Sequence, residues 1–189
     1  MIPILITGPV MEPLSLAEAK AWLKVDGTEE DELIRTLIIA ARLMVEAEIG
    51  QVLIGQNWRL IGDSWPQSAE IPIRPGRVLA VGGARVFSAA GLATPIPASA
   101  FTLVEKGTGQ GQCLLISNPP APGRARAGIE IDVRLGFGEA ASDVPEEIRL
   151  AIRRVLALWF ENRGDGAAEE AGLPPQIRAL LRPFRQMRL

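Results

Sequence analysis

The sequence predicts an α+β fold, a helical bundle built from the N- and C-terminal helices with an antiparallel β-rich subdomain inserted between them. The first observation is that helical periodicity fills both ends of the chain, residues 14–51 and the part that begins at residue 141. The second is that residues 52–140 contain short β-type runs separated by Gly and Pro. Neighbouring runs are close in sequence, which favours an antiparallel meander or small curled sheet over βαβ units.

Residues 1–13 are expected to form an extended N-terminal arm, because they are apolar and are interrupted by three prolines. They lack the basic start of a signal peptide. No apolar run in the chain approaches the roughly 20 residues that span a bilayer. We therefore expect a soluble intracellular protein with no membrane partner.

Two helices are predicted within residues 14–51. The first begins at Ser15, an N-cap whose capping-box partner is Glu18, and runs to about residue 24. Thr28 is the expected N-cap of a long helix over residues 29–49, with four acidic residues in its first turn. Gly50 is a natural C-terminal stop for this helix.

The inserted part, residues 52–140, is predicted from its β-branched and aromatic runs. A glycine-rich turn over residues 106–111 is expected to join two of the strands in a hairpin. The candidate strands are Asn57–Ile61, Glu70–Ile73, Leu79–Phe87, Phe101–Glu105, Gln112–Ser117 and Gly128–Leu135.

Helix returns in residues 141–172, which are expected to hold a long helix that starts near Pro145 and a flexible break at Gly164–Ala168. Residues 173–189 form the last segment, a docking helix and tail. Its short helix is expected to run from Pro174 to about Leu181 and to end before Pro183.

The composition excludes several kinds of chemistry. The 189 residues include no histidine, which removes His-based triads and His-ligated metals. Cys113 is the only cysteine and lies in an apolar strand pattern, so we expect a buried small side chain. The spacing Gly107-x-Gly109-x-Gly111 lacks the strand–turn–helix context of a phosphate loop. We expect no catalytic residues, no metal site and no cofactor.

The C-terminal tail carries the most informative charge pattern. From residue 176 onward it contains four arginines and no acid, whereas the whole chain has a formal charge of −2. One interpretation is a solvated basic end. The others are docking onto an acidic partner protein or facing DNA phosphates, since a guanidinium binds both anions bidentately. The arginines are Arg178, Arg182, Arg185 and Arg188.

Three motifs follow one another in a fixed order along the chain. Residues 14–26 read LSLAEAKAWLKVD, residues 144–163 open with VPEEIR and close with WFENR, and residues 173–184 run from LPP to LLRPF. Together they resemble the motifs of phage head–tail connector (adaptor) proteins, and the resemblance covers nearly the whole chain. It is weakest between residues 62 and 128.

The resemblance implies a subunit of a closed ring, usually of about a dozen copies, in the neck of a virion or phage-like particle. Such a ring sits below the portal protein and joins it to the next neck or tail component, the stopper. DNA passes through its channel without sequence-specific binding. The particle would be assembled in the bacterial cytoplasm and would come from a phage, a prophage or a gene transfer agent.

Our hypothesis for the working surface is that the tail docks on the portal, with Phe184 as an apolar anchor. Two rival classes stay open. One is a small nucleic-acid-binding module that uses its arginine-rich C-terminus, and the other is a carboxylate-based hydrolase, for which the sequence offers no acid–base pair. The predicted docking residues are Arg178, Leu181, Arg182, Phe184, Arg185 and Arg188.

Overall fold

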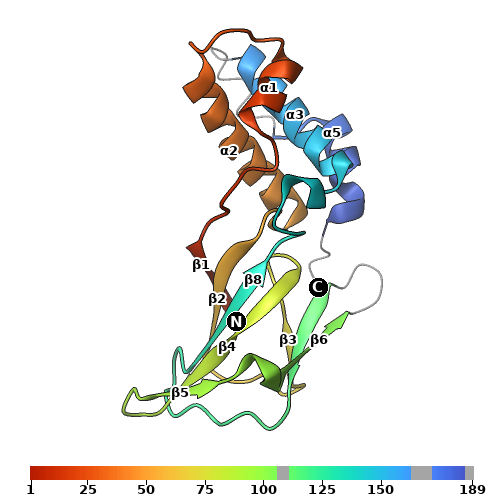
Figure 1. Cartoon of the computed structure of the whole chain (residues 1–189). Coiled ribbons are helices and arrows are strands. Elements are labelled where there is room, and N and C mark those ends of the chain that lie inside the picture. Colours follow the sequence, from red (N-terminus) through yellow and green to blue (C-terminus); the bar gives the residue numbers. More distant parts are fainter. Residues whose placement is uncertain (106–110, 163–171, 186–189) are drawn as a thin grey trace.

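The computed structural model of the chain describes residues 1–105, 111–162 and 172–185. Helices occupy one end of the molecule and strands the other (Figure 1). The expected break at Gly164–Ala168, most of the turn expected at 106–111, and Arg188 lie outside the described residues. An α+β architecture, with helices from both ends of the chain and strands from its middle, is confirmed.

The helical end is a bundle in which α2 packs against α3, and α3 also packs against α1 and α5. Its core is formed by the apolar stripes of these helices together with Leu14, Leu53 and Ile54 from the adjoining segments. Short 3₁₀ turns, η2 and η3, precede α3 and follow α5. The helical elements are α1 (Leu16–Leu23), α2 (Asp31–Ile49), η2 (Ala141–Asp143), α3 (Glu146–Glu161), α5 (Pro175–Leu181) and η3 (Arg182–Phe184).

Local capping signals explain where the first helices begin and end. The Ser15 hydroxyl accepts a hydrogen bond from the Glu18 N–H at 3.2 Å, and the Ser15 N–H donates to the Glu18 carboxylate at 2.9 Å, so the capping box is confirmed. Gly50 ends α2 with a φ of +69°, as expected for a left-handed C-cap.

The predicted N-cap at Thr28 is wrong. The helix α2 begins at Asp31, and Glu30 occupies the cap position without a side-chain capping bond. The preceding turn is held differently, because the Lys20 ammonium donates to the carbonyl of Gly27 and pairs with the Asp31 carboxylate at 2.6 Å. This contact between α1 and the start of α2 displaces the helix start by two residues.

The strands form two antiparallel sheets, so the expected antiparallel pairing is confirmed for every pair of named strands. The five-stranded sheet has the order β1-β2-β8-β4-β5, and the three-stranded sheet has the order β3-β7-β6. The strands are β1 (Ile2–Thr7), β2 (Gln56–Gly62), β3 (Glu70–Pro72), β4 (Val78–Phe87), β5 (Ala93–Ile96), β6 (Phe101–Glu105), β7 (Gln112–Ile116) and β8 (Ile129–Leu135), with a 3₁₀ turn η1 (Ala98–Ala100) before β6.

Of the two expected arrangements, the meander is wrong, because β8 lies between β2 and β4 instead of at an edge. Its side chains alternate between buried apolar residues and charged residues on the opposite face. Pairing on both sides satisfies the backbone of this strand and places its apolar face at the centre of the β core. The two faces carry Ile129, Ile131, Val133 and Leu135, and Glu130, Asp132 and Arg134.

The expected N-terminal arm proves to be partly a strand. Residues 2–7 form β1, which pairs antiparallel with β2 in a register that places Ile4 opposite Arg59. The segment is extended as expected, but it belongs to the edge of the five-stranded sheet. All six residues of β1 are exposed.

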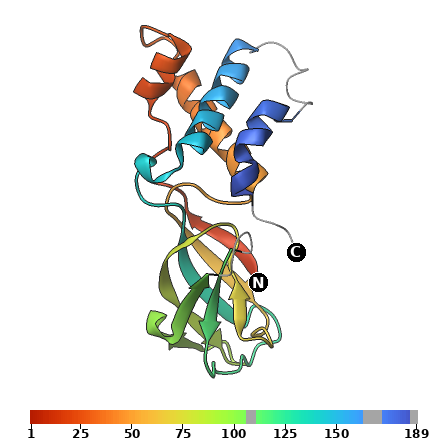
Figure 2. The ribbon, with the colours of Figure 1, turned by 90° about the vertical axis from the view of Figure 1, so that its right-hand side faces the viewer.

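Seen from the right-hand side of Figure 1, the molecule presents α3, α5 and the three-stranded sheet in front, with α2 and β1 behind (Figure 2). The β core lies between the two sheets and is separate from the core of the bundle. Its buried residues include Leu60, Ile71, Val86, Leu114 and Ile131. The molecule therefore has two hydrophobic cores joined end to end.

Candidate partner-docking surfaces

The short helix α5 has one buried and one exposed face. Ile177 and Leu181, one turn apart, are buried in the bundle core. Arg178 and Arg182, also one turn apart, are both exposed. The arginine spacing therefore places two of the predicted docking residues on one accessible helical face.

After α5 the chain lies against the C-terminal end of α2. Phe184 is half-buried against the bundle core, and its carbonyl accepts a hydrogen bond from the Gln51 side chain. Arg185 donates to the carbonyl of Glu48 at 3.3 Å and approaches the Glu48 carboxylate at 3.5 Å. A cation at this position complements the negative end of the α2 dipole.

The structure thus divides five of the six predicted docking residues into groups, and Arg188 lies outside the described residues. Arg178 and Arg182 face solvent, Phe184 and Arg185 lie against α2, and Leu181 is fully buried. In this conformation Leu181 anchors the tail to its own bundle instead of facing a partner. Docking of the tail onto a portal remains a prediction.

Sequence reasoning missed a buried polar cluster where the bundle meets the β region, which we call the junction: Glu12, Arg42, Glu46 and Gln56. Arg42 donates to the Glu12 carboxylate at 2.7 Å and to the Glu46 carboxylate at 2.9 Å. Glu46 also accepts from the Leu53 N–H at 2.9 Å and from the Gln56 amide at 3.1 Å. One carboxylate therefore connects α2 to the segment that leads into β2.

Burial shapes the electrostatics of this junction. Desolvation raises the pKa of Glu46 above its ordinary value, although the Leu53 N–H and the Arg42 guanidinium oppose the rise. The sequence did hold a signal for the cluster. Arg42 and Glu46 are four residues apart and fall among the buried positions of the α2 stripe, where charged side chains require partners.

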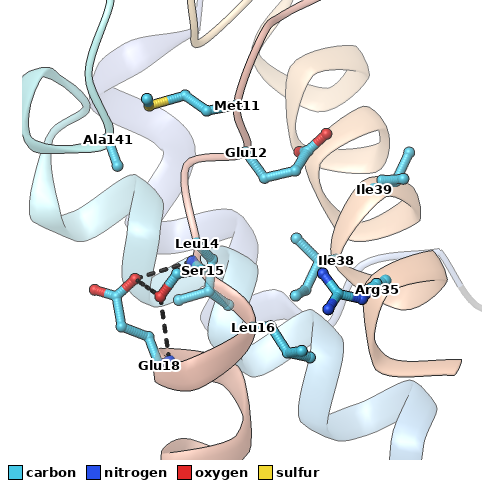
Figure 3. Close-up of a pocket in the computed structure, with 10 residues that line it drawn as sticks. All are labelled: Met11, Glu12, Leu14, Ser15, Leu16, Glu18, Arg35, Ile38, Ile39 and Ala141. Atoms are coloured by element: carbon cyan, nitrogen blue, oxygen red, sulfur yellow. Dashed lines mark hydrogen bonds between the residues drawn. The ribbon is translucent and has the colours of Figure 1, made fainter. Parts of the chain in front are cut away.

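A groove that shares Glu12 with the junction lies between α2 and residues 11–16 (Figure 3). Its volume is about 460 Å³. Met11 and Ile39 contribute apolar walls, and Arg35 and Glu12 contribute charged groups. The groove is open and holds no arrangement of side chains suited to acid–base chemistry.

The described residues contain no group of three or more His, Cys, Asp or Glu side chains that could hold a metal ion. Cys113 is buried, as expected from its strand pattern. No helix in the described part of the chain has the length and apolar character needed to cross a membrane. The main features of the described residues are the exposed face of α5, the groove beside α2 and the polar junction.

Comparison with known proteins gives a consistent result at the level of structure. No protein-family model matches the sequence, and neither does any curated protein. The chain is similar to a chain in the neck of an empty gene transfer agent particle computed with C6 symmetry, with a TM-score of 0.81 and 26% identity. It is also similar to a chain in the neck of a native particle computed with C12 symmetry, with a TM-score of 0.75 and 25% identity.

A chain in the virion of a native gene transfer agent particle is similar in fold as well, with a TM-score of 0.78 and 24% identity. Each similarity covers 100% of this chain and 97% of the other chain. The resemblance read from the three sequence motifs is confirmed, because the full-length structural neighbours are consistent with a phage-derived head–tail connector.

Proposed function

We propose that this chain is a head–tail connector (adaptor) subunit that forms a ring in the neck of a phage or phage-like particle. The observation that carries the proposal is similarity over the full chain to proteins of gene transfer agent necks. This similarity directly supports a structural component of the particle neck. We further propose that the ring lies below the portal, joins it to the next neck component and surrounds a central DNA channel.

Cyclic symmetry supports the ring. The two neck structures that contain similar chains were computed with C6 and C12 symmetry, so several copies surround one axis. In a closed ring each subunit uses one surface to contact a different surface of its neighbour. Such a protein works through interfaces, and we propose that it is not an enzyme.

The exposed face of α5 is the proposed contact with the portal. Arg178 and Arg182 present two guanidinium groups on one helical face, which suits carboxylates of a partner protein. Leu181 holds this helix on the bundle from the opposite face. The arrangement offers charged contacts without requiring the tail to leave its own core.

The experiment mixes the purified chain with a portal protein from a gene transfer agent and examines the complex by electron microscopy and binding titration. We expect rings stacked on the portal. The double variant Arg178→Glu, Arg182→Glu is expected to keep its circular dichroism spectrum and to bind the portal at least about tenfold more weakly, since like charges replace complementary ones. The double variant Arg124→Glu, Arg126→Glu makes the same charge change in the exposed loop between β7 and β8 and is the matched control.

Absence of any assembly with the portal would contradict the adaptor role. Undiminished portal binding by the double variant would contradict only the contact through α5. A titration with double-stranded DNA at two salt concentrations tests the rival module. Strong binding that falls steeply with salt, combined with no portal binding, would favour that class instead.

A further inference from the structure

The exposed face of α2 lacks charge over three turns. Its exposed positions from residue 36 onward are Thr36, Ile39, Leu43 and Ala47, spaced by three, four and four residues. Ile39 is 44% exposed and Leu43 is 53% exposed. A helix face that meets solvent normally carries charged or polar residues, whereas this stripe extends about 16 Å at the helical rise without one.

In the β region, the strand β1 likewise exposes apolar side chains and carries no charge. Residues 1–11 contain no charged side chain, and β1 exposes Ile2, Ile4, Leu5 and Ile6 at the edge of the five-stranded sheet. Folded proteins usually protect such an edge with charge or cover it with another segment. The strands β2, β8 and β4 of the same sheet do carry charge, where Arg59 and Arg85 pair with Glu130 and Asp132.

The helix α2 and the strand β1 lie on one side of the molecule, with residues 8–12 running between them. Both are at the left in Figure 1 and behind α3, α5 and the three-stranded sheet in Figure 2. Met11 and Ile39 line the same groove, and the neighbouring Val10 is also exposed (Figure 3). We call this surface the uncharged side; it comprises Ile2, Ile4, Ile6, Val10, Met11, Ile39 and Leu43.

We propose that the uncharged side contacts a second copy of this chain, so that it forms one half of the subunit interface in the ring. The inference rests on the proposed function, because it requires a ring. Copies arranged about a cyclic axis, as in the C6 and C12 necks, each have a neighbour on two different sides. The centre of such a contact is depleted of charge, which this side matches.

The tail lies on the opposite side. In Figure 1 α2 is at the left of the bundle and α5 at its right. The buried face of α2 packs towards α3 and α5, so its exposed stripe is on the opposite face. Neither Arg178 nor Arg182 belongs to the uncharged side, so the two proposed contacts can be altered separately. The groove beside Ile39, about 460 Å³ in volume, provides a concave site that an apolar side chain of the neighbouring copy can enter.

The test is a double variant, Ile39→Glu with Leu43→Lys. Both side chains are exposed, and a Glu four residues before a Lys favours the helix, so the variant is expected to fold as the wild type does. Assembly would bury these charges. We expect the protein concentration for half-maximal ring formation, measured by native mass spectrometry and sedimentation, to rise at least about tenfold.

Leu92→Glu is the matched control. Leu92 is 73% exposed in the turn between β4 and β5, at the end of the β region farthest from the helices. Its substitution introduces a charge at a more exposed leucine and should leave ring formation unchanged. Circular dichroism and thermal unfolding of all three proteins verify that a loss of rings does not arise from unfolding.

The outcomes separate the two proposals. Rings that form equally well with the double variant overturn the uncharged side as the subunit interface and leave the adaptor role intact. Rings that persist while binding of the portal or the next neck component is lost overturn it too, because the surface then serves a different protein. A wild-type chain that forms no ring, alone or on the portal, overturns the proposed function itself.

Discussion

The two hydrophobic cores of this molecule are assembled from the chain in different ways. The bundle core joins residues 14–54 to residues 144–181, which are distant in sequence. The β core draws its buried residues from one continuous stretch, residues 52–135. Apolar burial stabilises each core but has little direction. The orientation of one core relative to the other therefore depends on the directional bonds of the junction between them.

Removing the central carboxylate of the junction is expected to have the largest effect. Glu46→Ala leaves Arg42 with one carboxylate partner and deprives the Leu53 N–H and the Gln56 amide of their acceptor. Loss of one member of a buried ion pair costs about 3–5 kcal/mol. Urea denaturation followed by circular dichroism and tryptophan fluorescence should show this loss.

The control for that measurement is Glu32→Ala on the exposed face of α2, where the carboxylate is 94% exposed. Its effect should stay below about 0.5 kcal/mol. Equal effects of the two substitutions would show that the junction contributes nothing beyond a surface ion pair.

Shortening the Leu181 side chain tests how much the stability of the bundle depends on the helix α5. Leu181→Ala opens a cavity in the bundle core and should destabilise the protein by about 2–5 kcal/mol. Hydrogen exchange should rise in α3 and α5 before it rises in β8. Arg182→Ala, at the neighbouring exposed position, should change stability by less than about 0.5 kcal/mol. A neutral Leu181→Ala would show that the tail is not held by this core.

A smaller loss of stability is expected when the N-cap of α1 is removed. Ser15→Ala removes the hydroxyl that accepts from the Glu18 N–H and should cost about 1 kcal/mol. Thr28→Ala serves as the comparison, because Thr28 does not cap α2. Thermal unfolding of both variants measures the difference, and equal melting temperatures would contradict the assigned caps.

The smallest expected effect is a pH dependence in the junction. Burial raises the pKa of Glu46 above 4.5, so the folded state holds its proton more tightly than the unfolded state does. The resulting stability is present below about pH 4.5 and is lost as pH rises through the folded pKa. Glu46→Gln lacks this titration.

The stability of the wild type relative to Glu46→Gln should accordingly fall as the pH rises above about 4.5, measured by urea denaturation in steps of about half a unit. A relative stability that rises over this range would mean that Arg42 lowers the pKa of Glu46 more than burial raises it.

Features that depend on residues close together in the sequence could be predicted, whereas features that depend on distant partners could not. The capping box at Ser15, the stop at Gly50 and the apolar face of α5 depend on residues within one or two turns, and the structure has all three. The strand β1 was missed because its partner β2 lies about fifty residues away. The strand β5, with Ala93 and Pro95, has weak strand propensity and owes its conformation to β4.

Some features of the candidate surfaces could likewise be predicted from the sequence, and others could not. The exposed pair Arg178 and Arg182 follows from helical spacing alone, whereas the burial of Leu181 depends on where α5 packs in three dimensions. The central position of β8 and the polar junction also depend on tertiary packing. A buried Arg42 could have been suspected from its place in the α2 stripe, but its partner Glu12 could not.

Because the bundle combines helices from both ends of the chain, it cannot be completed until translation is nearly finished. A ribosome delivers the chain from its N-terminus, so every strand through β8 has been synthesised before the first residue of α3. The helix α2 must wait for α3 and α5 to cover its buried face. We expect the β region to fold while translation continues and the bundle to close only near its end. A prematurely terminated chain would then lack a complete bundle, which would keep it out of the particle.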